Sequence, residues 1–68
     1  MEEITLKKPH ITLGQLLQVC GVADSGAQAK ILVKELTIRV NEEVENRRGR
    51  KLFVGDLVTI ESQQVLIK

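Results

Sequence analysis

The residues most able to bind another molecule lie in one short basic segment. Four of five consecutive residues are positively charged, namely Arg47, Arg48, Arg50 and Lys51 around Gly49. Arginine presents a planar set of donors that fits phosphate oxygens, and neighbouring positive charges repel one another unless an anion joins them. The formal net charge is only +1 because the carboxylates are scattered, so it is the local field that indicates an anionic partner. A solvated turn that aids solubility is the alternative that this segment alone leaves open.

A second candidate anion site is the start of a helix predicted after Ser25. A helix N-terminus carries free amides and a partial positive charge. Gly26 has no side chain, so a phosphate could approach the backbone there, and Lys30 and Lys34 share one helical face. A plain cap and solvated lysines would fit the same residues. Together with the basic segment, which we expect to be mobile, this helix favours nucleic-acid binding.

Residues for catalysis or metal binding are scarce. The chain has one histidine, His10, one cysteine, Cys20, and neither tyrosine nor tryptophan. His10 has no evident partner that would orient it as a general base. Cys20 falls on an apolar helical stripe, where a free cysteine acts as a small hydrophobic residue and should be unreactive. A metal site needs several such ligands. We therefore expect no enzymatic activity, no metal and no cofactor.

Two further kinds of site are disfavoured. Gly21 and Gly26 have the spacing of a phosphate-binding loop, but Ala27-Gln28 follows where lysine and a hydroxyl residue are required. A nucleotide-dependent enzyme is therefore remote. Phe53 is the sole aromatic residue, whereas proteins that hold single-stranded nucleic acid usually stack bases on several rings. A stacking platform is unexpected.

Two helices are predicted between residues 12 and 36. Thr12 with Gln15, and Ser25 with Gln28, have the spacing of a capping box. Each pair opens an apolar stripe of helical period, made of Leu13, Leu16, Leu17 and Cys20 in the first helix and Ala29, Leu32, Val33 and Leu36 in the second. Gly21 ends the first helix. This helical hairpin should bury one cluster beneath a sheet, comprising Leu16, Leu17, Leu32, Val33 and Leu36.

Strands are predicted on both sides of the hairpin. Polar and apolar residues alternate over residues 2–7 and 38–40, and an apolar, β-branched run covers residues 57–60. A turn is expected at residues 41–43, and Gln63-Gln64 separates a final strand at residues 65–67. The order strand, helix, helix, strands indicates an α+β domain with both helices on one side of a small antiparallel sheet.

Length and composition limit the organisation of the chain. Sixty-eight residues make one domain at most, so we expect a single domain at 1–68. One cysteine excludes an internal disulfide and fits a reducing compartment. No apolar run is long enough to span a membrane, and Met1-Glu2-Glu3 is acidic, unlike a signal peptide. The expected location is the cytoplasm.

Four segments resemble a known family in their order and spacing. These segments are Thr12-Leu13-Gly14-Gln15-Leu16-Leu17, residues 25–30, Ile38-Arg39-Val40-Asn41 and Val54-Gly55-Asp56. The family is the RNA-binding domain of ribosomal protein S-four, and the chain looks closest to the small stand-alone bacterial proteins of YaaA type. The resemblance implies a two-helix hairpin packed on a small, strongly bent antiparallel sheet, the alpha-L motif.

The resemblance also implies a function and a set of site residues. Family members bind folded RNA, often ribosomal or transfer RNA, across the helix pair and the neighbouring loop. By position this implicates Thr12, Gln15, Ser25, Gly26, Gln28, Lys30, Arg39 and Asn41, and the basic segment Arg47, Arg48, Arg50 and Lys51 extends the surface. We therefore expect recognition of structured RNA by shape and phosphate contacts, with no small-molecule substrate.

Three positions depart from the family pattern. Many members have arginine where Thr12 and Gly26 stand, so two positive charges are missing. Glu42 replaces the glycine that commonly follows the turn asparagine, and glutamate would be strained if that turn needs a positive φ. The alternative function is a protein-interaction adaptor that keeps the fold and uses an acidic edge around Glu42, Glu43 and Glu45.

Overall fold

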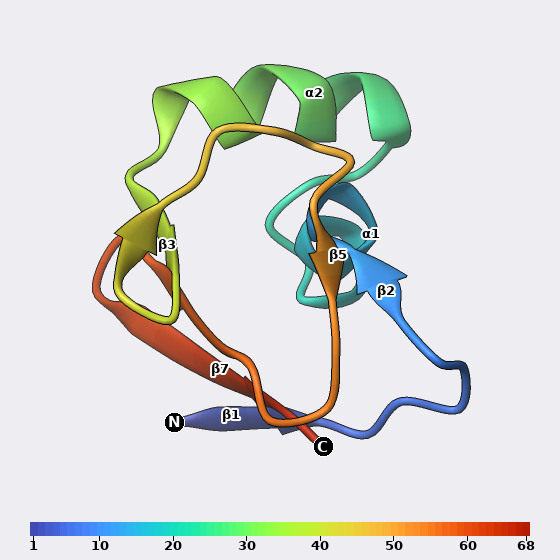
Figure 1. The fold of residues 1–68 in the computed structure, drawn as a ribbon. Helices are drawn as coiled ribbons and strands as arrows, with labels where there is room; N and C mark the ends of the chain where they lie inside the picture. Colours follow the sequence, from blue (N-terminus) through green and yellow to red (C-terminus); the bar gives the residue numbers. More distant parts are fainter.

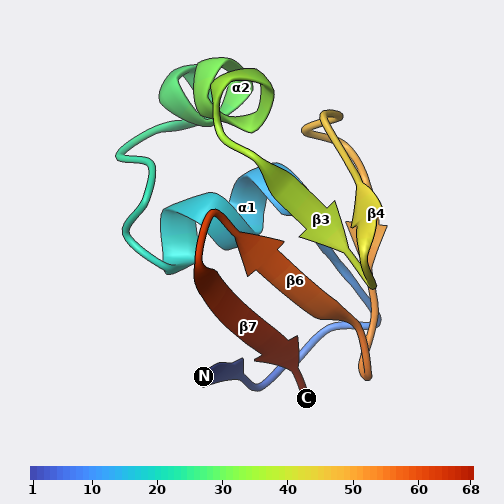
Figure 2. The ribbon, with the colours of Figure 1, turned by 90° about the vertical axis from the view of Figure 1, so that its left-hand side faces the viewer.

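The computed structural model describes residues 1–68 and contains two helices and seven short strands. In chain order these are β1 (Glu2–Ile4), β2 (Ile11–Thr12), α1 (Leu13–Val19), α2 (Gly26–Glu35), β3 (Ile38–Val40), β4 (Glu43–Val44), β5 (Lys51–Leu52), β6 (Leu57–Ile60) and β7 (Gln63–Ile67). Figure 1 shows α2 lying across the top of the molecule, with α1 behind β5. Figure 2 shows β3, β6 and β7 side by side, with α1 and α2 behind and above them. The predicted α+β arrangement is present.

The two helices begin at the predicted caps. The hydroxyl of Thr12 accepts a hydrogen bond from the Gln15 amide (3.2 Å), and the Gln15 side chain accepts one from the Thr12 amide (3.0 Å). This reciprocal pair is the predicted capping box. Ser25 likewise accepts from the Gln28 amide at 3.1 Å. The Gln28 side chain, however, accepts from the amide of Asp24. The second predicted box is therefore only half formed.

The core lies between the helices and the five-stranded sheet. It is one cluster of 13 buried residues, which are Leu13, Leu16, Leu17, Ala23, Ala29, Val33, Ile38, Val40, Leu52, Val58, Ile60, Val65 and Ile67. Leu32 and Leu36 are only partly buried and pack against this cluster. Ala29 and Val33, four residues apart, form the innermost line of α2, so the two leucines fall on its flank. The predicted cluster is correct for three of its five members.

The β structure differs from the single antiparallel sheet that we predicted. It consists of a five-stranded sheet in the order β1-β7-β6-β3-β4 and a separate pair, β2-β5. β1 pairs with β7 in parallel, with Glu2 opposite Val65 and Ile4 opposite Ile67, so the larger sheet is mixed. β1 also ends at Ile4 rather than Lys7. Alternation along a strand predicts which side chains face inward but carries no information about the direction of its partner.

The last hairpin also turns earlier than predicted. β7 begins at Gln63, which pairs with Ile60, and Gln64 pairs with Thr59. The two glutamines therefore belong to the strand, and Glu61 and Ser62 make the turn. Glu61 has a φ of 54°, the left-handed conformation that tight two-residue hairpin turns require. Neither helix is long and apolar enough to cross a bilayer.

Candidate nucleic-acid interface

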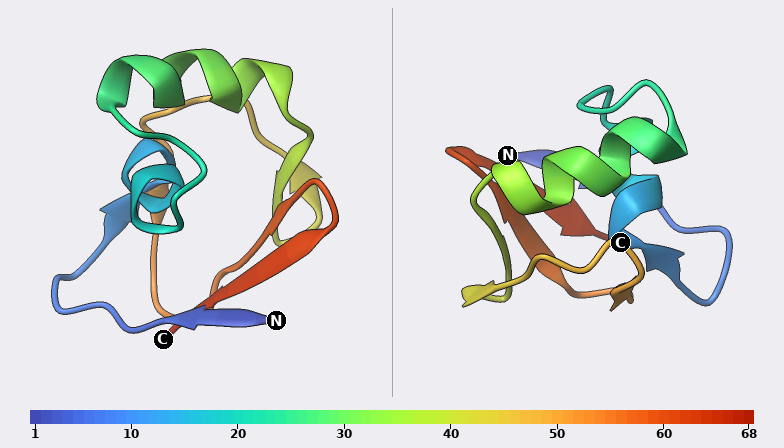
Figure 3. Two further views of the ribbon diagram at one scale, coloured as in Figure 1. Left: turned by 180° about the vertical axis from the view of Figure 1, so that it is seen from behind. Right: turned by 90° about the horizontal axis from the view of Figure 1, so that it is seen from above.

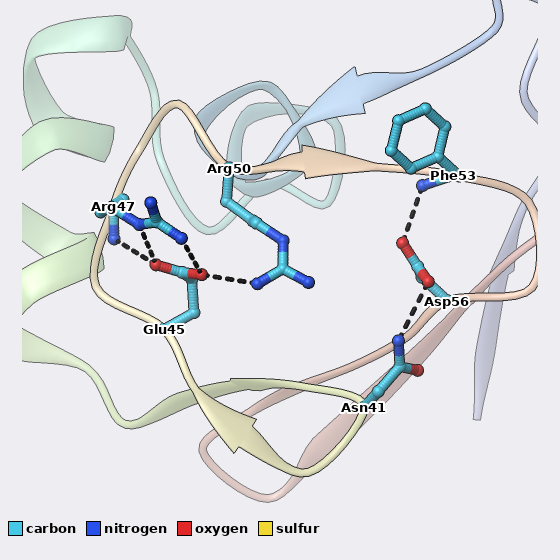
Figure 4. Close-up of polar contacts among 6 residues, drawn as sticks. All are labelled: Asn41, Glu45, Arg47, Arg50, Phe53 and Asp56. Atoms are coloured by element: carbon cyan, nitrogen blue, oxygen red, sulfur yellow. Dashed lines mark hydrogen bonds and ion pairs between the residues drawn. The ribbon is translucent and has the colours of Figure 1, made fainter.

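The basic segment, residues 47–51, is organised by one buried carboxylate. Glu45 is 6% exposed. Its Oε2 accepts hydrogen bonds from Arg47 Nε at 2.9 Å and from the Arg47 amide at 3.1 Å. Its Oε1 accepts from Arg47 Nη2 at 3.2 Å and from Arg50 Nη1 at 2.8 Å (Figure 4). Two of the four cations in this segment, which we call the basic loop, are therefore already paired within the protein.

These contacts change the ionisation of the groups involved. The side-chain hydrogen bond from Arg47 is the largest influence on Glu45, and it outweighs the opposing effect of burial. With a further hydrogen bond from Arg50, it lowers the pKa of Glu45 to about 2. The same carboxylate raises the pKa of Arg47 above its usual value. The sequence suggested cations that need an external anion and an exposed acidic edge that includes Glu45. Glu45 supplies that anion for Arg47 and Arg50 only, and it is buried rather than part of an exposed acidic edge.

The backbone of the basic loop is fastened to the start of α1. The amide of Leu13 donates to the carbonyl of Arg50 at 2.8 Å, and the amide of Gly14 donates to the carbonyl of Arg48 at 2.9 Å. Figure 1 shows the chain between β4 and β5 passing from the β3 side of the molecule to the α1 side. The first turn of α1 thus gives its amides to the loop rather than to a ligand. This anchoring contradicts the expectation that the basic segment is mobile.

Arg48 joins the two helices. Its side chain lies so close to Gly14 that a Cβ on that glycine would stand 2.5 Å from Arg48 Cγ. Beyond that contact, Arg48 Nη1 donates to the carbonyl of Gly26, in the first turn of α2, at 3.3 Å. The absence of a side chain at Gly14 is therefore what lets the guanidinium reach the start of α2.

An open hollow lies where the loop meets both helices. It has a volume of about 280 Å³ and is lined by Thr12, Gly14, Gln15, Gln18, Gly26, Arg48 and Gly49. None of these residues is acidic. At the α2 end, the amides of Gly26 and Ala27 make no hydrogen bond within the protein, so they remain available to an anion. The hollow therefore combines the Arg48 guanidinium, the free backbone amide of Gly26 and the neutral side-chain amides of Gln15 and Gln18.

The predicted site residues divide into two groups. Thr12, Gln15 and Gly26 line the hollow, and Ser25 and Gln28 cap the helix beside it. Lys30 is exposed one turn further along α2, in a shallow depression that also contains Lys34. The views from behind and from above in Figure 3 show α2 as an outer element, with one long side free of other secondary structure. Gly26 lines the hollow and the next residue, Ala27, lines the depression with Lys30, so the two adjoin at the start of α2.

Arg39 and Asn41 lie away from that region, on β3 and in the turn after it. Arg39 is exposed and faces Thr59 and Val44 across the sheet. Asn41 Nδ2 donates to Asp56 Oδ1 at 3.0 Å (Figure 4), and its Oδ1 accepts from the Leu57 amide at 2.9 Å. Both polar groups of Asn41 are thus used to tie two turns together. Its place in an RNA contact stays a prediction.

The turn after β3 adopts the conformation that the family pattern requires. Asn41 has a φ of 52° and Glu42 a φ of 73°. Two successive positive φ values are typical of a tight hairpin turn. Asparagine tolerates this region, whereas glutamate is strained in it. The replacement of glycine by Glu42 therefore leaves the turn geometry in place at a local energetic cost.

Four residues of the candidate interface were not among the predicted site residues: Gly14, Gln18, Gly49 and Glu45. Gly14 is an unfavourable residue inside a helix, which could have indicated close approach of another segment. Gln18 follows Gln15 by three positions and so shares its face. Glu45, two residues before the arginines, carries no pattern that separates a buried acid from a surface one.

Comparison with known proteins shows which family the chain belongs to. Residues 4–68 match the sequence model of the family described as S4 domain. The chain belongs to this family. The probable ribosome maturation protein RlbA of Bacillus subtilis is 50% identical over 58 residues, which cover 85% of this chain and 82% of the relative. The putative RNA-binding protein YbcJ of Escherichia coli is 38% identical over 61 residues, which cover 90% of this chain and 87% of YbcJ.

The fold comparison agrees with the sequence comparison. The solution structure of YbcJ from Escherichia coli matches with a TM-score of 0.72 and 37% identity, over 98% of this chain and 86% of that chain. Its description assigns that protein an alpha-L motif involved in RNA binding. The S-four resemblance and the α+β fold with a helix pair are therefore confirmed.

One arginine of the basic loop lies beside the two positions at which the family resemblance implied missing positive charges. Thr12 and Gly26, the two positions where many members have arginine, both line the hollow that Arg48 enters. Arg48 bonds to the carbonyl of Gly26, so one guanidinium from the loop stands beside both positions. The position of Arg48 partly restores the charge that the two substitutions remove.

Proposed function

We propose that residues 1–68 form a single RNA-binding domain that recognises structured RNA by its shape and its phosphates. The contact surface is the hollow between α1, α2 and the basic loop, extended by Lys30 along α2 and by Lys51 at the end of the loop. The observation that carries this proposal is the convergence of Arg48 and Gly26, whose backbone amide is free, in a hollow without carboxylates. The names of YbcJ and RlbA support it.

The geometry favours folded RNA over a flexible strand. Arg48 is held by Gly26, and the loop backbone is held by α1, so these phosphate donors have fixed relative positions. A rigid A-form helix or helix–loop junction can match fixed positions, whereas any polyanion can match free charges. We propose ribosomal RNA as the leading class, since RlbA is named a probable ribosome maturation protein. The protein would act in the cytoplasm, by binding rather than by catalysis.

Binding titrations over a range of salt concentrations test this proposal. The RNA is a folded stem–loop, and a single strand of the same length is the comparison. Arg48→Ala and Lys51→Ala are suitable variants because neither residue takes part in an ion pair. Each should weaken binding to the stem–loop by about tenfold and lower the slope of log affinity against log salt by roughly one unit.

Lys68→Ala is the matched control. It also removes one positive charge, but Lys68 pairs with Glu3 at the end of the sheet opposite the helices (Figure 1). This variant should change affinity by less than about twofold, because charges beyond a Debye length are screened. If Arg48→Ala and Lys51→Ala bind as well as the parent while remaining folded, the RNA-binding surface is wrong. Binding by none of these proteins would favour the adaptor function.

A further inference from the structure

The only phenylalanine of the chain, which has neither tyrosine nor tryptophan, lies beside the basic loop rather than in the core. Phe53 directly follows β5, and 50% of it is exposed. Its neighbour Leu52 is fully buried. Because successive side chains in extended backbone point to opposite sides, the burial of Leu52 turns Phe53 outward. Half exposure of a large ring forgoes much of the stabilisation that burial would give.

The backbone of Phe53 is fixed on both sides. Its amide donates to Asp56 Oδ2 at 2.8 Å, and its carbonyl accepts from the Asp56 amide at 3.0 Å. The other oxygen of Asp56 accepts from Asn41. Figure 4 shows the ring pointing away from this carboxylate. The ring is therefore presented to solvent from a rigid turn.

A positively charged hollow adjoins the ring. It has a volume of about 510 Å³ and is lined by Arg47, Gly49, Arg50, Lys51 and Phe53. Three of the five lining residues are cations, and none is acidic. Lys51 is exposed and takes part in no ion pair. The His10 ring packs against Phe53, with ring centroids 5.9 Å apart and planes tilted by 51°.

We propose that this hollow binds one unpaired nucleotide of the RNA, with its base stacked on Phe53 and its phosphate bound by Lys51. This inference rests on the proposed function and extends it from phosphate recognition to recognition of a nucleotide outside the helix. Every base has a π-face that stacks on an aromatic ring, and each nucleotide adds one phosphate. An apolar protein segment matches less well, because three of the five lining residues carry a positive charge.

The single phenylalanine of the chain is consistent with a site that stacks on one base only. A single phenylalanine cannot support a run of bases, so an extended stacking platform stays unexpected. One ring is sufficient for one base. A fully paired helix keeps its bases stacked internally and offers none to Phe53, whereas a bulge or loop offers one.

Two matched RNAs test the inference: one helix with a single-nucleotide bulge and the same helix fully paired. The Phe53→Leu variant keeps an apolar side chain but loses the flat face. It should bind the bulged RNA roughly tenfold more weakly and the paired RNA within about twofold of the parent. Val54→Ala is the control, because Val54 is 66% exposed beside Phe53 and does not line the hollow. It should leave both affinities unchanged.

A fluorescence measurement gives a second, independent readout. The chain has no tryptophan, so Phe53→Trp introduces a unique reporter into the hollow. The bulged RNA should quench its emission by stacking, and the paired RNA should not. Val54→Trp, the control reporter, should respond alike to both RNAs.

The possible outcomes separate this inference from the proposed function. If Phe53→Leu binds both RNAs like the parent, and Phe53→Trp shows no selective quenching, the nucleotide site is wrong. The proposed function still stands in that case if Arg48→Ala weakens binding. If the parent protein binds neither RNA, both the function and the site are overturned.

Discussion

The basic loop and the outer face of α2 both carry positive charge, but they hold it in opposite ways. In the loop, Arg47 and Arg50 are bonded to the buried carboxylate of Glu45, and Arg48 is bonded to a backbone carbonyl. On α2, Lys30 and Lys34 are exposed and take part in no ion pair. The three arginines of the loop are therefore cations in fixed positions, two of them neutralised by Glu45, while the lysines of the helix are full charges on flexible side chains.

This difference indicates a division of labour within one interface. Fixed donors discriminate between shapes, because a partner must place its phosphates where the donors already are. Flexible lysines add attraction that depends on salt and hardly on shape. Changes in the loop should therefore alter stability and selectivity, and changes on α2 should alter affinity alone.

The largest effect is expected from Glu45→Ala, which removes the anion that holds the loop. Loss of its hydrogen bonds with two charged groups should lower the free energy of unfolding by about 1–3 kcal/mol. The released arginines should increase affinity for single-stranded RNA and reduce the preference for folded RNA. Chemical denaturation and binding titrations measure the two effects. Glu43→Ala is the matched control, since Glu43 is exposed and unpaired.

The same residue predicts a dependence of stability on pH. Its pKa is about 2 in the folded protein and 4.5 as the ordinary value. A carboxyl with a lowered pKa stabilises the fold fully above its unfolded pKa, and this contribution is lost as pH falls through the folded pKa. The stability difference between the parent and Glu45→Ala should thus narrow between pH 4.5 and about 2. A difference that stays constant over this window would contradict the pairing.

A smaller effect on the free energy of unfolding is expected from Gly14→Ala, and its sign should depend on whether the Arg48 side chain is present. Gly14→Ala should favour the helix by about 0.5–1 kcal/mol, but the added Cβ would collide with Arg48, at a cost of about 1–3 kcal/mol. The single variant should therefore be destabilised. In an Arg48→Ala background the collision disappears, and the same substitution should stabilise the domain. Additive free energies in this double-mutant cycle would show that Arg48 does not lie against Gly14.

The smallest effect on stability is expected from Lys30→Ala, within about 0.5 kcal/mol. Its affinity should fall similarly for folded and single-stranded RNA, and the salt slope should decrease by roughly one unit. Lys34→Ala, one turn further from the hollow, should have a weaker effect of the same kind. If Lys30→Ala lost affinity for folded RNA alone, Lys30 would make a fixed contact. The contrast between fixed donors in the basic loop and flexible lysines on α2 would then be wrong.

Local patterns in the sequence determined the helix pair. The caps at Thr12 and Ser25 and the apolar stripes depend on residues three or four apart, so they are visible without the fold. The positions of Thr12, Gln15 and Gly26 in the interface followed from the family resemblance. The family and the α+β fold that it implied are confirmed.

Only the tertiary structure shows which strands pair and which groups the charged side chains contact. The parallel pairing of β1 with β7 joins the two ends of the chain, and no local alternation indicates its direction. The burial of Glu45 depends on how the loop folds over α1, since an isolated glutamate beside arginines would be solvated. Arg48 reaches Gly26 across 22 residues of sequence because Gly14 leaves room for it. The residue types were thus visible in the sequence, but their contacts depend on packing between distant segments.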